Sequence, residues 1–89
     1  MSNAISGEMR VISLIKVKGE LDSNILKEKV LDSAKKLGIE NIEIVETLGR
    51  VDYALIYGAK SIEDVNKFAL EIRKIPDVVD SETLIGLIK

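Results

Sequence analysis

The stretch ETLGRVDYALIY, residues 46 to 57, decides the fold because it joins a tight turn to a strand that is apolar on both faces. Leu48, Gly49 and Arg50 are few enough for a hairpin connection, and Gly49 can adopt a positive φ. Alternating and β-branched residues on either side indicate strands over residues 41–47 and 51–57. We therefore expect a β-hairpin in the middle of the chain.

A strand and then a helix precede this hairpin. Residues 9–18, MRVISLIKVK, are β-branched and aliphatic and predict a first strand. Apolar residues then recur at helical spacing through Leu26, Val30 and Ala34. We expect this helix to be capped by Asp22 and to end at Gly38.

A second helix and a last strand follow the hairpin. The Ser-x-x-Asp pattern of residues 61–64 is typical of a helix start, and Pro76 forbids continuation of the helix. Residues 81–89, SETLIGLIK, read as the closing strand. The element order is βαββαβ, and right-handed crossovers then give one antiparallel sheet with both helices on one face. The expected fold class is therefore α+β and ferredoxin-like.

Length and composition limit the possible functions. The chain has 89 residues, 13 basic and 15 acidic, with a net charge of -2, and it contains neither cysteine nor histidine. We expect a tag and disordered N-terminus over residues 1–8 and a single domain over residues 9–89. The weak negative charge argues against direct nucleic-acid binding, and no apolar run is long enough for a membrane span. A cytoplasmic protein without metal, cofactor or catalytic residues is the default expectation.

The strands predict an interface, because three of them are apolar on both faces although two helices can cover only one. A large uncovered apolar face usually marks an interaction surface. The simplest partner is a second copy related by a two-fold axis, which gives a homodimer of the dimeric α/β barrel type. A different protein on that face is the alternative. The residues assigned to the dimer interface are Tyr53, Leu55, Tyr57, Ile85 and Leu87.

Residues 48–89 resemble the C-terminal effector-binding (RAM) domain of the Lrp/AsnC transcription regulators. The resemblance rests on three short motifs: Gly49-Arg50-Val51-Asp52, Ile75-Pro76-Asp77-Val78 and Ser81-Glu82-Thr83. Val51, Asp77 and Ser81 depart from the aromatic residue, glycine and threonine of that family. TLGRVD, residues 47–52, also resembles the turn of the GYD-domain proteins, which share the fold and the sheet pairing.

The resemblance implies a stand-alone regulatory domain that forms dimers and then larger rings. Such a domain would bind an amino acid or a related small molecule between dimers. It would lack its own DNA-binding domain and would act through mixed assembly with a DNA-binding homologue. The resemblance places ligand-binding residues at Gly49, Arg50, Asp52, Ser81 and Thr83.

Each assignment has a structural alternative. Asp52 can accept backbone N–H groups in the turn, Gly49 can serve only its φ angle, and Arg50 can be a solvated charge. Ser81 and Thr83 can make only cross-strand contacts. For the whole protein, the alternatives are an adaptor or oligomerisation module of GYD type without a ligand and, third, a cofactor-free enzyme.

Overall fold

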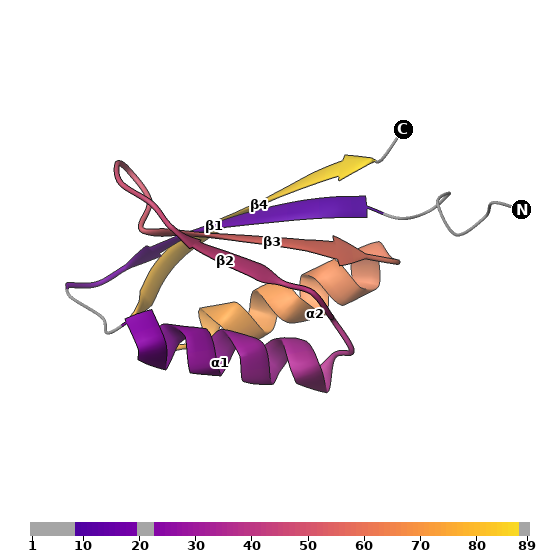
Figure 1. The fold of residues 1–89 in the computed structure, drawn as a ribbon, viewed down its shortest axis with the longest axis horizontal. Helices are drawn as coiled ribbons and strands as arrows, with labels where there is room; N and C mark the ends of the chain where they lie inside the picture. The colour runs from indigo at the N-terminus through magenta and orange to yellow at the C-terminus, as the bar shows by residue number, and fades with distance from the viewer. Residues whose placement is uncertain (1–8, 20–22, 88–89) are drawn as a thin grey trace, which may run out of the picture.

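The computed structural model describes residues 9–19 and 23–87, with the backbone alone at Leu87 (Figure 1). It confirms the predicted ferredoxin-like order of strands and helices. The elements are β1 (Met9–Val17), α1 (Ser23–Lys36), β2 (Glu43–Glu46), β3 (Tyr53–Ala59), α2 (Ile62–Arg73) and β4 (Val78–Leu87). The predictions for residues 1–8 and for the Asp22 cap lie outside the described residues.

The four strands form one antiparallel sheet in the order β2-β3-β1-β4. Both helices lie on the same side of the sheet, and Figure 1 shows them together below the strands. The loop between β2 and β3 projects on the opposite side (Figure 1). One face of the sheet is therefore covered by helices, and the other is covered by no described element.

The helix ends are set by the residues that the sequence indicated. Gly38 has φ +72°, and its N–H donates to Lys35 O at 3.2 Å while Ile39 N–H donates to Ala34 O at 2.9 Å. This pair of bonds is the Schellman arrangement that closes a helix at a glycine. At the start of α2, the Ser61 hydroxyl accepts the Asp64 N–H at 3.1 Å, which confirms the predicted cap.

Strand bounds differ from the predictions at the hairpin and at β4. The third strand was expected over residues 51–57, but β3 covers Tyr53–Ala59, because Asp52 turns out of the strand to bind the end of β1. The last strand was expected from Ser81, but β4 begins at Val78. The Val78 N–H donates to Ile75 O at 3.0 Å, so the turn is tight, and Val78 already pairs with Val17.

The core lies between the helices and the strands. Tyr57 and Phe68 meet edge to face at its centre, with ring centroids 5.0 Å apart and an interplanar angle of 86°. Tyr53, Leu55 and Tyr57 are 4%, 0% and 0% exposed, and they belong to the same cluster as the inner faces of α1 and α2. Their assignment to the dimer interface is therefore wrong: the helices of their own chain already cover them.

The other two predicted interface residues lie on β4. Ile85 pairs with the buried Val11, and paired residues of antiparallel strands share a face. Ile85 therefore points to the helix-covered side, where it is 43% exposed beside α2. Leu87 pairs with Met9, but its side chain lies outside the described part of the structure.

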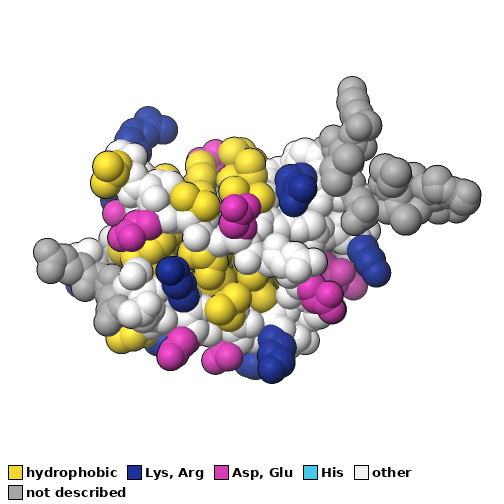
Figure 2. Space-filling view, viewed as in Figure 1, with side chains coloured by type: hydrophobic (Ala, Val, Ile, Leu, Met, Phe, Trp, Pro, Cys, Tyr) yellow, Lys and Arg dark blue, Asp and Glu magenta, His cyan; other side chains and the backbone are white. Residues whose placement is uncertain are grey.

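The strand residues that alternate with the buried ones point to the helix-free face. Cross-strand pairing puts six apolar side chains on it: Ile12, Leu14, Val45, Ala54, Ile56 and Leu84. We call this set the open-face cluster. Leu84 is 46% exposed and Val45 37%. In Figure 2, hydrophobic side chains gather along the edge above β2 and again in the gap between β2 and α1.

Candidate functional site

A groove of about 430 Å³ runs between α2 and β4 on the helix-covered side. Its apolar wall consists of Val65, Ala69, Leu70 and Ile85. Its polar wall consists of Asn66, Arg73, Ser81 and Thr83. The groove thus combines an aliphatic surface with hydroxyl, amide and guanidinium groups, which suits a small molecule with one polar and one apolar end.

Arg73 provides the positive charge of this groove. It lies in the last turn of α2, and its Nε–H donates to the Ser81 hydroxyl at 3.3 Å. One such bond leaves most of the guanidinium donors free, and a guanidinium binds carboxylates through paired N–H groups. The arrangement can therefore hold an anionic group beside Ser81.

A row of hydroxyl groups leads from the groove into the core. Thr83 pairs across the sheet with Ser13, a polar residue that is only 4% exposed. The buried Tyr57 hydroxyl makes no hydrogen bond to any described residue, although the Ser13 side chain is near enough to act on it. Burial raises the pKa of Tyr57, and the Ser13 hydroxyl lowers that pKa by a smaller amount.

Asp52 lies at the opposite side of β1, where the β2–β3 loop closes. Its Oδ2 accepts the Val17 N–H at 2.9 Å, and its own N–H donates to Ile15 O at 2.9 Å. Thr47 completes the closure, since its N–H donates to Asp52 O at 2.9 Å and its hydroxyl to Val51 O at 2.8 Å. Asp52 thus holds the loop against β1 through its carboxylate and its backbone.

Gly49 and Arg50 form the exposed part of the same loop. Gly49 has φ +125°, a conformation that favours glycine, and a Cβ there would meet nothing within 4 Å. The Arg50 carbonyl accepts a long hydrogen bond from Lys16 Nζ at 3.5 Å. The Arg50 side chain is exposed. The neighbouring Leu48 is fully exposed, at 101%.

The five predicted ligand residues therefore fall into two groups within one chain. Ser81 and Thr83 line the α2–β4 groove, whereas Gly49, Arg50 and Asp52 do not. Ser81 pairs with Ile15, which pairs with Tyr53, so the loop and Ser81 are two strands apart, about 10 Å. The α2–β4 groove therefore reaches only one of the two groups, and the ligand role of all five residues stays a prediction.

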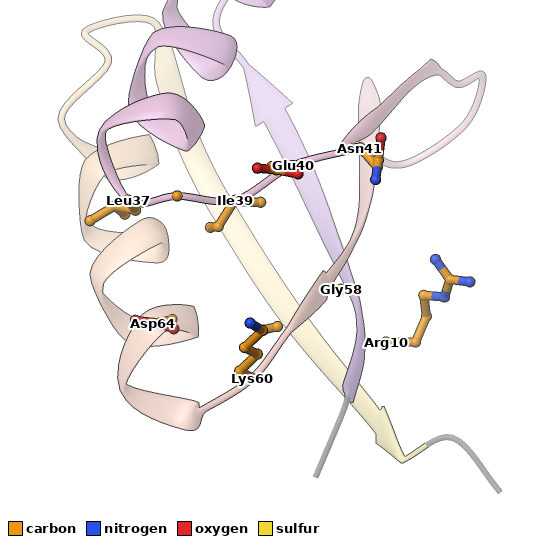
Figure 3. Close-up of a pocket in the computed structure, with 10 residues that line it drawn as sticks. Arg10, Leu37, Ile39, Glu40, Asn41, Gly58, Lys60 and Asp64 are labelled. Carbon is orange, nitrogen blue, oxygen red and sulfur yellow. The ribbon is translucent and has the colours of Figure 1, made fainter. Parts of the chain in front are cut away.

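A second pocket, of about 440 Å³, lies at the other end of the sheet. The connection from α1 to β2 and the first turn of α2 form one side of it, and Gly58 of β3 lies at its centre (Figure 3). Lys60 and Asp64 lie on the helix side of β3, and Arg10 projects on the other side of that strand (Figure 3). The pocket thus wraps around β3 beyond the point where β2 covers its edge.

Sequence reasoning missed Arg73 and Asn66. Both lie on the α2 face that carries Ala69, since positions 66, 69 and 73 are neighbours along a helix surface. A search for polar residues at that spacing, combined with the hydroxyl residues of the following strand, could have found the groove. Among the described residues, no group of three or more acidic side chains is placed to hold a metal ion. No helix in the described ranges is both long and apolar enough to span a bilayer.

Comparison with known proteins supports the fold. A scan against protein-family models gives no match, and neither does a search of curated proteins. Among solved structures, FFRP-DM1 is similar with a TM-score of 0.68 and 20% identity, over 88% of this chain and 97% of that chain. An AsnC family transcriptional regulator from Agrobacterium tumefaciens has a TM-score of 0.68 and 12% identity, and the match covers 100% of this chain but 57% of the regulator.

The same fold occurs in proteins of other kinds. A dimeric ferredoxin-like protein of unknown function from Bacteroides fragilis has a TM-score of 0.60 and 12% identity, over 94% of this chain and 99% of that chain. The hydroxynitrile lyase from Passiflora edulis has a TM-score of 0.59 and 18% identity, over 92% and 94%. At these identities the likeness establishes the fold alone. Because one similar structure is an enzyme, the expectation of no catalysis stays a prediction.

Proposed function

We propose that this protein is a regulatory domain that pairs through its helix-free sheet face and binds a small amino-acid-like molecule. In this proposal the homodimer is the functional unit, and it can assemble further into rings or with a DNA-binding homologue. The proposal combines an interface on one side of the sheet with a groove on the other. Each part rests on different residues and can be tested separately.

The observation that carries the proposal is the open-face cluster. Its side chains occupy the middle of a sheet face that no described element covers, and Leu84 is nearly half exposed. Full burial of an exposed aliphatic side chain contributes about 1.5–3 kcal/mol, and covering the partly exposed Leu84 and Val45 contributes part of that amount for each. An apolar sheet face is covered most simply by an identical face across a two-fold axis.

Ligand binding is supported by the α2–β4 groove. Arg73 offers free N–H donors for a carboxylate, and Ser81 and Thr83 offer hydroxyl groups at the same wall. Leu70 and Ile85 supply an apolar surface for a side chain of the ligand. A small carboxylic acid with an aliphatic or aromatic part therefore fits the chemistry of the groove best.

The comparisons supply the regulatory part of the proposal. One similar structure is an AsnC family transcriptional regulator, and another is FFRP-DM1, which has nearly the same extent as this chain. By analogy, ligand binding changes how copies assemble, and the assembly changes the action of a DNA-binding partner. The alternative is an adaptor of the same architecture that binds no small molecule.

A thermal-shift screen against the amino acids tests ligand binding. A true ligand at about 100 times its Kd stabilises the native state by about 2.7 kcal/mol and raises Tm of a domain of this size by about 10 °C or more. The matched variants are Arg73→Gln and Thr83→Val, which remove groove donors, with Lys27→Gln on the exposed side of α1 as control.

The expected result is a Tm increase in the wild type and in Lys27→Gln that is lost in both groove variants. No increase with any amino acid contradicts the sensor and supports the adaptor. An increase that persists in both groove variants places the ligand elsewhere and contradicts the assignment of the groove.

A further inference from the structure

The pocket of about 440 Å³ at the end of the sheet lies against a part of β3 that β2 does not cover. The pairing of these two strands ends at Glu43 and Ile56, but β3 continues to Ala59. Before β2, Asn41 has φ +57°, which a strand does not adopt, so β2 extends no further along β3. Beyond Ile56, this edge of β3 therefore has no neighbouring strand among the described residues.

Gly58 turns its backbone N–H and C=O toward this open edge. Thr47 N–H donates to Asp52 O, so Thr47 and Asp52 continue the β2–β3 register as a hydrogen-bonded pair. Such pairs recur at every second residue of an antiparallel strand, which makes Glu43 and Ile56 the last of them. The next residue of β3 with the same orientation is Gly58, and neither its N–H nor its C=O has a partner among the described residues. The edge thus presents one free donor and one free acceptor to the pocket.

Arg10 brings a positive charge to the same place. It comes from β1, which lies on the other side of β3 from the open edge, and yet it lines this pocket. Arg10 pairs with Gly58, so both residues belong to the helix-free face. Because Gly58 has no side chain, the guanidinium can reach the pocket across the strand. Arg10 is exposed, and it makes no hydrogen bond or ion pair with any described residue.

The fold itself gives no reason for a glycine at position 58. Gly58 does not have a positive φ, and a Cβ there would meet only Met9 O, at an ordinary distance of 3.8 Å. Glycine inside a strand weakens it, and it often marks a place where a ligand or another backbone approaches closely. A group bound at the open edge, within reach of Arg10, would account for this glycine.

The free groups define the chemistry of the ligand. One N–H and one C=O at the edge of a sheet complement the C=O and N–H of another peptide unit, as in the addition of a strand to a sheet. A guanidinium without a partner complements a carboxylate. The pocket is otherwise lined by charges of both signs, among them Lys60, Glu40 and Asp64, which suits a polar ligand. The C-terminal end of a peptide combines a peptide unit with a carboxylate.

We propose that this pocket binds the C-terminal end of a short peptide in an extended conformation. The N–H and C=O of Gly58 pair with the last peptide unit of the ligand, and the Arg10 guanidinium holds its terminal carboxylate. The inference goes beyond the proposed function, because one chain contains the whole site. It needs neither the pairing of two sheets nor the α2–β4 groove.

An NMR titration of the wild-type chain with N-acetyl-alanyl-alanine tests the site. The largest change in amide chemical shift is expected at Gly58, because its N–H gains an acceptor. The same peptide with a C-terminal amide is the matched control, and it is expected to bind about five- to tenfold more weakly, because it lacks the charged acceptor for Arg10. Acetate, which has the carboxylate without the peptide unit, is expected to leave the Gly58 signal in place.

Two variants test the two parts of the site. Arg10→Gln is expected to bind the acid and the amide equally well, whereas Lys18→Gln, which removes an exposed charge beyond the other end of β1, keeps the preference for the acid. Gly58→Val places a side chain between Arg10 and the edge, and it is expected to raise the Kd about tenfold while circular dichroism shows an intact fold.

Three results would overturn the inference. The first is a Gly58 signal that the peptide does not shift, or that acetate shifts equally. The second is equal binding of acid and amide by the wild type. The third is unchanged binding in Gly58→Val. Each of them leaves the sheet pairing and the α2–β4 groove untouched, since those are tested by sedimentation and by the amino-acid screen.

Discussion

The two faces of the sheet are built from the same strands but differ in burial. On one face, Val11, Ile15 and Leu55 are completely buried under the helices. On the other, Ile12, Leu14 and Ile56 occupy the alternate positions and stay partly exposed. Both sets are aliphatic, so hydrophobicity alone does not distinguish the two faces. One face therefore stabilises the fold, and the other is available to stabilise an assembly.

The largest expected effect concerns the covered face. Phe68→Ala removes a fully buried ring that packs against Tyr57, and it is expected to lower the free energy of unfolding by about 3–5 kcal/mol. Denaturant unfolding followed by circular dichroism measures the loss. A loss below about 1 kcal/mol would mean that this face is not the core of the fold.

The next effect concerns the helix-free face. Leu84→Lys places a charge in the open-face cluster and is expected to raise the dimer Kd at least about tenfold while the chain stays folded. Ile62→Lys is the matched control, because Ile62 is 58% exposed on α2, away from this face. Equal effects of the two substitutions in a sedimentation experiment would remove the distinction between the helix-free face and the rest of the surface.

Asp52 lies at the boundary of the sheet, where its carboxylate accepts the Val17 N–H. Asp52→Ala removes a charged acceptor and is expected to cost about 1.5–3 kcal/mol of unfolding free energy. Asp52→Asn keeps an acceptor oxygen, so its loss should be smaller. If both variants unfold like the wild type but lose the thermal shift by an amino acid, Asp52 acts in ligand binding instead of in the loop.

The smallest effect concerns the Tyr57 hydroxyl, the one fully buried side-chain polar group without a hydrogen bond among the described residues. Tyr57→Phe removes it and is expected to leave the unfolding free energy equal or up to about 1 kcal/mol higher near pH 7. The substitution leaves the neighbouring Ser13 hydroxyl unchanged, so any difference in unfolding free energy comes from the Tyr57 hydroxyl. A loss above about 1 kcal/mol would show that the hydroxyl has a stabilising partner.

The pH dependence of the same variant gives a second readout. Burial raises the pKa of Tyr57 in the folded state, so the native chain holds this proton more tightly than the unfolded chain. The contribution is complete below the unfolded pKa of about 10 and is lost as pH rises through the folded pKa. The wild type should therefore lose more stability above about pH 10 than Tyr57→Phe does. Identical losses would contradict the burial of this hydroxyl.

Much of the fold could be predicted from local signals. Gly38 ends α1 and Ser61 caps α2, as their chemistry predicts. The predicted hairpin around Gly49 joins β2 to β3. Strand bounds were less predictable. Asp52 and Val78 depend on how they meet the end of β1, and that contact between distant segments is not visible in local spacing.

The two faces were assigned the wrong way round because β3 is apolar on both. Tyr53 and Tyr57 resemble interface anchors, yet the helices cover them. A signal was present in the neighbouring strands: Arg10 and Lys16 share a face with Ile12 and Leu14, and charged residues mark the side that the helices leave open. The buried Ser13 obscured that signal, since it places a polar residue on the covered face.

The candidate site was predictable only in part. Ser81 and Thr83 were found through a resemblance, and the structure adds Arg73 from the helix that packs beside them. That neighbour is set by the packing of α2 on β4, which depends on the whole core. The separation of the β2–β3 loop from the groove is likewise a property of strand order, because β1 lies between β3 and β4.

The central claim is that the helix-free face is covered by a second copy of the same sheet. Sedimentation equilibrium of the wild-type chain over a range of concentrations tests it most directly. The account predicts a species of twice the 9.8 kDa chain mass at low micromolar concentration, which dissociates on introduction of Leu84→Lys. A folded species of 9.8 kDa across the whole range would contradict it.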